Sequence, residues 1–296
     1  MENELTAMNA ELVEQLRAAQ DELEPQFKAL RTATGALNQA IKLAGAETFD
    51  ALAMQKTLAR LQQTHGSLSN DALETATAAF AAATQQALDA LAFAFARDLK
   101  AAFEQRGQSV EGRPPVLVVD SLVLNIDIGA RKAQWFYGKE ALTRPLPLSI
   151  DPILKAYDAQ RKAIVERTID VPAFLGELHK AWQDLIDERL QRSGRRPSGN
   201  RLNLVETYSK LVLNRQSARF WNAPSRSTFR DYERPFFVRD LVLAQSAPTV
   251  VVDGQTHRLR LGVATKSQAD SATRSIWLPN GPLDGEYYAD ITFEGE

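Results

Sequence analysis

The chain has 296 residues, a formal net charge of −2, 44% hydrophobic residues and no cysteine. This composition is typical of a folded globular protein, and it excludes disulfides, thiolate zinc sites and cysteine nucleophiles. The acidic N-terminal sequence lacks the basic and apolar regions of a secretory signal, and no apolar run reaches the roughly 20 residues of a membrane span. We therefore expect a cytoplasmic protein that makes no membrane contact.

The N-terminal region carries apolar residues at intervals of three and four, which is the spacing of a helical stripe. The repeat is closer to eleven residues than to a heptad. Pro25 interrupts the pattern, so either the helix kinks there or a second helix begins. The stripe consists of Leu5, Met8, Leu12, Leu16, Ala19, Leu23, Phe27 and Leu30.

Two further helices are expected before residue 108. Gly45 is a candidate helix stop and Thr48 a candidate cap for the helix that follows it. Asp71 and Glu74 have the spacing of a capping box at the start of an alanine-rich segment. We predict three long helices over residues 1–108, arranged as an antiparallel bundle or a coiled-coil hairpin.

A proline- and glycine-bearing stretch at residues 106–115 marks the predicted boundary of a second domain, residues 116–296. One or two buried strands are expected over 116–128, because β-branched and aliphatic residues dominate there. Helices are predicted at 151–169, 171–191, 202–221 and 232–244, and strand pairs at 249–263, around the turn residues Asp253 and Gly254, and at 275–294. The predicted class is α+β: an N-terminal long-helix bundle or coiled-coil hairpin, followed by a mixed α/β domain that ends in antiparallel strands.

Asp120 and Asp127 flank the predicted strands, where ligands for Mg²⁺ are found in many phosphate-handling enzymes. No phosphate-binding glycine loop accompanies them, and no lysine lies two residues after Asp127. The sequence favours turn residues that hydrogen-bond to the backbone. A metal-dependent nuclease centred on Asp120 and Asp127, with Glu140 and Lys132 nearby, remains a less favoured alternative.

Other catalytic patterns are absent from the sequence. The three histidines, His65, His179 and His257, lie in distant segments and match no metal-binding motif. They are interpreted as solvated or hydrogen-bonded side chains. Neither a nucleophile elbow nor a dinucleotide-binding glycine motif occurs. We therefore predict no cofactor, no bound metal and no catalytic residue, and a non-catalytic protein is favoured over an enzyme.

The feature that departs most from an average sequence is a basic segment at residues 189–230. It contains ten basic residues and one acidic residue, Glu206, which gives a net charge of +9. Nine of the ten are arginine, which suits bidentate contacts with phosphate. The candidate nucleic-acid-binding residues are Arg192, Arg195, Arg196, Arg201, Lys210, Arg215, Arg219, Trp221, Arg226 and Arg230.

Two interpretations of this segment stay open. Its arginines either contact a DNA or RNA backbone, or they pair with acidic residues of this chain or of a partner protein. Aromatic residues between 220 and 237 are interpreted mainly as core, with Trp221 as the exception that can stack on bases. We expect an accessory or assembly subunit that binds nucleic acid through the segment and associates, with itself or a partner protein, through residues 1–108. The alternative is an adaptor that docks on an acidic partner.

Overall fold

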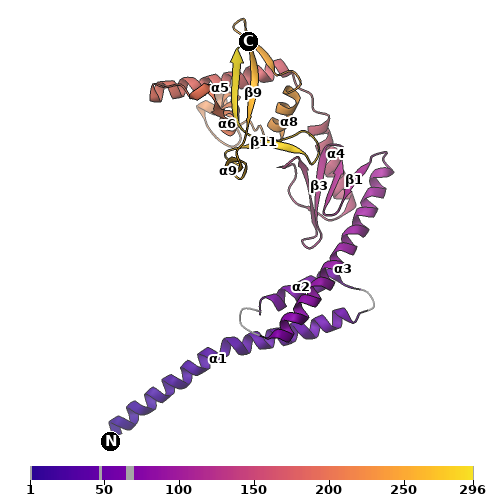
Figure 1. The fold of residues 1–296 in the computed structure, drawn as a ribbon, viewed down its shortest axis with the longest axis vertical. Coiled ribbons are helices and arrows are strands. Elements are labelled where there is room, and N and C mark those ends of the chain that lie inside the picture. Colours follow the sequence, from indigo (N-terminus) through magenta and orange to yellow (C-terminus); the bar gives the residue numbers. More distant parts are fainter. Residues whose placement is uncertain (1, 47–48, 65–69, 296) are drawn as a thin grey trace. The chain divides into compact units, whose positions relative to one another are not determined.

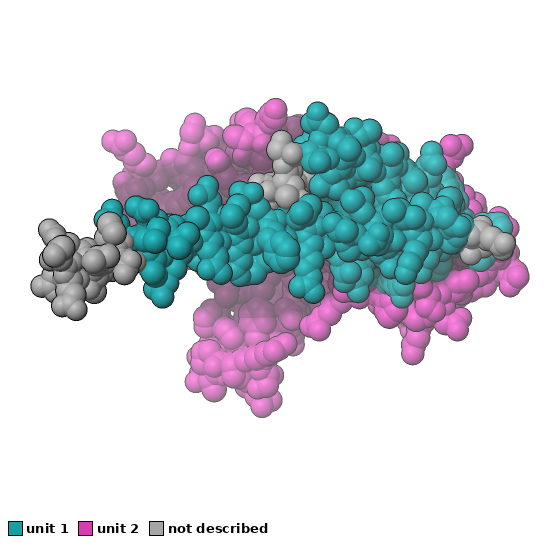
Figure 2. Space-filling view, turned by 90° about the horizontal axis from the view of Figure 1, so that it is seen from below, with its two compact units in different colours: residues 1–98, 127–131 teal, residues 99–126, 132–296 magenta. Residues whose placement is uncertain are grey.

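The computed structural model describes residues 2–46, 49–64 and 70–295. These residues form two compact units, which Figure 2 distinguishes by colour: residues 1–98 with 127–131, and residues 99–126 with 132–296. The α+β class is confirmed, because long N-terminal helices precede a region of antiparallel strands (Figure 1).

The N-terminal region contains helices α1 (Glu2–Ala44), α2 (Ala51–Gln62) and α3 (Asp71–Glu104). The prediction of three long helices is wrong for α2, which has only 12 residues. Pro25 lies inside α1, which continues through it as one helix. A proline there removes a single backbone hydrogen bond, and the remaining turns on either side keep the segment helical.

Local side-chain caps set the helix boundaries. Gly45 directly follows the last residue of α1, as predicted. The Asp50 side chain accepts a hydrogen bond from the Ala53 amide (3.0 Å) and so begins α2; the predicted cap, Thr48, lies outside the described residues. Asn70 caps α3 by accepting from the Leu73 amide (2.9 Å). The prediction that Asp71 is the cap is therefore wrong by one residue.

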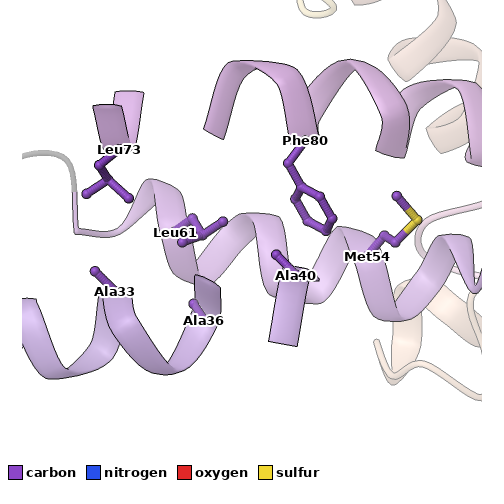
Figure 3. Close-up of a cluster of buried hydrophobic side chains, with 7 residues drawn as sticks. All are labelled: Ala33, Ala36, Ala40, Met54, Leu61, Leu73 and Phe80. Carbon is purple, nitrogen blue, oxygen red and sulfur yellow. The ribbon is translucent and has the colours of Figure 1, made fainter. Parts of the chain in front are cut away.

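A small core joins the second half of α1 to α2 and α3 (Figure 3). Alanines of α1 allow close approach of the larger side chains from the other two helices. The buried members are Ala33, Ala36, Ala40, Met54, Leu61, Leu73 and Phe80. Residues 12–30 of α1 contribute none of these side chains, and Figure 1 shows that part of the helix running free of α2 and α3.

Residues 110–147 form a six-stranded antiparallel sheet. Two of its strands lie within residues 116–128, where one or two strands were predicted, and the other four were not predicted. Its order is β1-β2-β3-β4-β5, and β6 pairs with β4. The interior includes Trp135, whose indole packs with Phe103 and Tyr157. The strands are β1 (Val110–Arg113), β2 (Val116–Val119), β3 (Leu122–Asp127), β4 (Lys132–Tyr137), β5 (Glu140–Ala141) and β6 (Leu146–Pro147).

Helical elements follow this sheet. The predicted helix 151–169 instead ends as α4 at Gln160 and continues as a short π-helix, and the predicted helix 202–221 is broken at residues 215–217. The elements are α4 (Ile150–Gln160), η1 (Arg161–Val165), α5 (Val171–Ser193), η2 (Ser198–Asn200), β7 (Leu202–Asn203), α6 (Leu204–Asn214), α7 (Ala218–Asn222) and α8 (Arg234–Ala244).

The C-terminal strands form a second antiparallel sheet, with the order β10-β11-β9-β8 and with β7 paired to β11. The predicted hairpin is confirmed: Val252 pairs with Gln255, and Asp253 and Gly254 have the positive φ angles that a two-residue turn requires. Helices α5 and α6 contact this sheet (Figure 1). The remaining elements are β8 (Thr249–Val252), β9 (Gln255–Val263), α9 (Lys266–Ala269), β10 (Ile276–Pro279) and β11 (Gly285–Gly295).

Among the helices of the described residues, none combines the length and the hydropathy that crossing a bilayer requires.

Candidate nucleic-acid interface

The loop that follows α5 is held in place by its own backbone and by one tryptophan. Gly194 adopts a left-handed conformation and donates its amide to the Leu190 carbonyl (2.8 Å), which ends the helix. At the far end of the loop, the Trp182 indole N–H donates to the Asn200 carbonyl (2.9 Å). The loop backbone is therefore hydrogen-bonded to α5 at both of its ends, through Gly194 and through Asn200.

Four arginines border one open pocket of about 260 Å³ at this end of α5. We call Arg189, Arg192, Arg195 and Arg196 the arginine cluster; Ser193 and Pro197 complete the lining. Arg189 pairs with Glu206 (2.5 Å) and Arg192 lies 3.8 Å from Glu188. Arg195 and Arg196 are exposed and form no ion pair within the part of the chain that the structure describes.

Two of the candidate residues are instead used to join α6 to α5. Lys210 forms a 2.5 Å ion pair with Glu188, and Arg215 forms a 2.6 Å ion pair with Glu177. The Arg215 guanidinium also lies 3.9 Å from the centroid of the Tyr232 ring. Both cations are largely covered, so their charges are balanced by the fold and offer little to a ligand.

These contacts show that α5 and α6 run antiparallel. Arg189, near the end of α5, pairs with Glu206 at the start of α6, whereas Arg215, just after α6, reaches back to Glu177. Glu177 lies 16 positions before Ser193, the last residue of α5, which corresponds to roughly 24 Å of helix length. The basic segment therefore does not form one continuous face, and its exposed arginines separate into groups at opposite ends of the helix pair.

The second group lies in residues 217–230, which we call the aromatic loop. Ser217 caps α7, and the Gln216 side chain holds the backbone of Arg230 with two hydrogen bonds (2.8 and 2.9 Å). The Phe220 ring packs against those of Trp221 (centroids 5.2 Å) and Phe229 (5.5 Å), and Trp221 remains 57% exposed. The exposed arginines of this loop, which form no ion pair among the described residues, are Arg219, Arg226 and Arg230.

The aromatic residues after position 219 thus divide between surface and interior. Tyr232 and Phe237 are buried, as the sequence interpretation expected, and Trp221 is exposed, also as expected. Phe229 departs from the core interpretation because it is 37% exposed and belongs to the aromatic loop. Its neighbours along the chain place it in a surface turn that short polar side chains hold together, Ser225 and Thr228 among them.

Arg201 belongs to neither group. It borders a separate pocket of about 240 Å³ with Arg260, Asp290 and Glu294. Arg260 pairs with Glu294 (3.1 Å), and the mixed charge of this lining offers no net attraction for an anion. Arg201 is exposed and has no ion pair among the residues described.

The aspartates beside β3 occupy turns. Asp120 has a positive φ of 55° in the turn between β2 and β3, and its carboxylate accepts a hydrogen bond from Tyr157. Asp127 closes the turn after β3 by accepting from the Ala130 amide (2.8 Å). Glu140, the third acidic residue of the metal hypothesis, is paired with Arg234 (2.8 Å). No group of three or more potential metal-binding side chains occurs in the described residues.

A histidine pair is the arrangement that the sequence did not reveal. The His179 and His257 rings lie 4.6 Å apart, and His179 also packs against Trp182 and Phe293. Burial, reinforced by the charge of His257, lowers the pKa of His179, and Asp253 opposes this shift. The interpretation of His179 as solvated or hydrogen-bonded does not hold for its Nε2 atom, which is buried and has no hydrogen-bond partner among the described residues. His65 lies outside them.

Arg189 was also missed as a member of the cluster. Its spacing of three residues before Arg192 gives the signal, because residues three positions apart lie on one side of a helix and both belong to α5.

No protein-family model matches the chain, and the searches of curated proteins and of solved structures returned no significant match.

Proposed function

We propose that this chain is a non-catalytic subunit that binds the sugar-phosphate backbone of a nucleic acid through the arginine cluster. The observation that carries the proposal is the pocket at the end of α5, where four guanidinium groups border one opening and two of them lack a carboxylate partner among the described residues. The planar guanidinium matches phosphate in a bidentate geometry. Phosphate contacts of this kind provide affinity without reading sequence.

The aromatic loop provides a second contact in this proposal. Trp221 presents more than half of its surface to solvent, and Arg219 and Arg226 flank it in the sequence. An exposed indole beside cations stacks on unpaired bases, which every base permits because each has a flat face. We therefore expect single-stranded nucleic acid to bind more tightly than duplex.

The test is a fluorescence-anisotropy titration of the full chain with labelled single- and double-stranded DNA and RNA at 50 and 200 mM salt. If the cluster neutralises about four phosphates of a duplex, the fourfold rise in salt should lower the affinity roughly 150-fold. Arg195→Glu/Arg196→Glu removes two of the four contacts, so the slope of log affinity against log salt should become shallower by about 1.8. Trp221→Ala should weaken single-strand binding and leave duplex binding almost unchanged.

The matched control is Arg113→Glu/Arg144→Glu, which changes the net charge by the same amount at two exposed arginines outside the basic segment. We expect it to keep most of the affinity. An equal loss of nucleic-acid affinity in Arg195→Glu/Arg196→Glu and in the control would mean that the total charge of the protein, not the arginine cluster, governs binding. Absence of binding at 50 mM salt would contradict the proposal and would favour the adaptor alternative, an acidic protein partner at the same surface.

A further inference from the structure

The first part of α1 carries an apolar stripe that no other described residue of the chain buries. Five large side chains of the stripe are between 53% and 65% exposed, although they lie on one side of a regular helix. Single exposed apolar residues are ordinary, but an aligned series of them marks an interaction surface. They are Leu12, Leu16, Leu23, Phe27 and Leu30.

The spacing of the stripe is the same in both directions. Along the sequence the apolar positions 5, 8, 12, 16, 19, 23, 27 and 30 are separated by 3, 4, 4, 3, 4, 4 and 3 residues. Each position therefore has a counterpart with which its number sums to 35. In an antiparallel pair of identical helices centred between Arg17 and Ala18, every apolar position faces another: 12 faces 23, and 16 faces 19.

The charges along α1 favour the same direction. Residues 2–24 contain seven acidic residues and one basic residue, whereas residues 25–44 contain three basic residues and no acidic one. A parallel pair in register would superimpose the two acidic halves along their length. The antiparallel register places Lys28 and Arg31 opposite positions 7 and 4 of the second copy, within its acidic beginning, so opposite charges approach at both ends.

The length of the free segment fits this register. Leu30, the last position of the stripe, precedes Ala33, which is the first of the described α1 side chains to be buried against α2 and α3. Pairing of the stripe positions therefore requires none of the residues of the intramolecular core. Pro25 lies two positions from Leu23, about 200° around the helix, and so does not interrupt the stripe.

We propose that residues 2–33 of α1 form an antiparallel two-helix contact with a second copy of this chain, centred between Arg17 and Ala18. This specifies the association that the sequence led us to expect for residues 1–108, and it does not depend on nucleic-acid binding. Because apolar side chains form the contact, the dimer should persist in 500 mM salt, whereas phosphate binding should weaken steeply. The two proposals can therefore fail independently.

The oligomeric state is the first test, by light scattering of the eluting full chain. The wild type is expected to be a dimer, and Leu16→Glu, which brings two carboxylates together near the symmetry axis, should weaken dimerisation at least about 100-fold. The control is Ile41→Glu, because Ile41 is 68% exposed on the same helix but lies beyond the overlap. A monomeric wild type, or equal loss in both variants, would overturn the proposal.

Direction and register are tested by cross-linking, for which the absence of native cysteine is an advantage. Leu12→Cys and Leu23→Cys are prepared with tags of different size, oxidised separately and as a mixture, and separated on a non-reducing gel. In the proposed register, like positions are 11 residues apart, roughly 16 Å along the helix, so only the mixture should give a disulfide-linked dimer. Cross-linking of each variant alone would indicate a parallel pair and would contradict the register.

Discussion

Arginine has opposite roles in two regions of this protein. Arg167, in the segment before α5, forms two hydrogen bonds with Asp240 of α8 (2.5 and 2.8 Å), and Arg215, just after α6, is held by Glu177 and the Tyr232 ring. At the end of α5, Arg195 and Arg196 are exposed and have no acidic partner among the residues described. The side chain is the same in both regions. The surrounding elements supply a carboxylate in the first region and supply none, among the described residues, in the second.

This comparison has a consequence for function and stability. Where the fold supplies a carboxylate, removing the arginine or its partner leaves an unbalanced polar group and destabilises the native state. Where the fold supplies none, removing the arginine costs little stability, and its effect is on binding. The predictions below test this separation, in order of decreasing effect on the free energy of unfolding. All four tryptophans belong to the unit with residues 132–296, so their fluorescence reports on that unit.

The largest effect is expected for Asp240→Ala. Asp240 is almost completely buried and accepts hydrogen bonds from Arg167 and from the Tyr232 hydroxyl (2.7 Å). Removing the carboxylate leaves both donors without their acceptor, and loss of one partner of a buried ion pair costs about 3–5 kcal/mol. Urea unfolding followed by tryptophan fluorescence measures this loss.

The corresponding control is Arg195→Ala/Arg196→Ala, which should change the free energy of unfolding by no more than about 0.5 kcal/mol. A similar destabilisation by both variants would remove the distinction between the two regions. If Asp240→Ala changes the free energy of unfolding only slightly, water takes the place of the carboxylate as the hydrogen-bond acceptor for Arg167 and Tyr232.

A smaller effect is expected for Arg215→Lys, which keeps the charge and removes the planar group over Tyr232 (3.9 Å from the guanidinium to the ring centroid). Stacked guanidinium groups contribute about 0.5–2 kcal/mol, and the ion pair with the exposed Glu177 adds less than about 1 kcal/mol. We therefore expect destabilisation of about 1 kcal/mol for the lysine variant and more for Arg215→Ala. Equal stability of Arg215→Lys and the wild type would show that the charge at position 215, and not the planar group over Tyr232, accounts for the contribution of this residue.

The smallest effect concerns pH and the histidine pair. Burial lowers the pKa of His179 below its ordinary value of 6.5, so the unfolded chain binds a proton more readily than the folded one. Stability from the neutral imidazole is therefore complete above about pH 6.5 and decreases as the pH falls through that value. The groups that face it are His257 and Asp253.

The measurement is urea unfolding of the wild type and His179→Phe at pH 7.5 and 5.5. The wild type should lose more stability on acidification than the variant, which has no proton to bind at this position. Identical losses would mean that other groups determine the pH dependence.

Much of the fold followed from local sequence patterns. The turn at Asp253 and Gly254 was predictable because few residue pairs adopt two successive positive φ angles. The break after α6 was not predicted, because the clamp formed by Gln216 depends on the backbone of Arg230, 14 residues further along, although the Ser217 cap of α7 is local. Four of the six strands in the first sheet were also missed. Strands β1, β5 and β6 have only two to four residues and carry little alternation, whereas the burial of β4 does alternate along its six residues.

The sequence by itself determined the identity and number of the basic residues, the apolar stripe of α1 and the turns that hold Asp120 and Asp127, whereas the exposure of the stripe came from the structure. The sequence did not determine which cations remain available to a ligand. That depends on ion pairs such as Lys210 with Glu188, 22 residues apart, and Arg215 with Glu177, 38 residues apart. Periodicity and turn chemistry are local and can be read from neighbouring residues, whereas the balance of a charge is decided by groups that meet only when the helices pack.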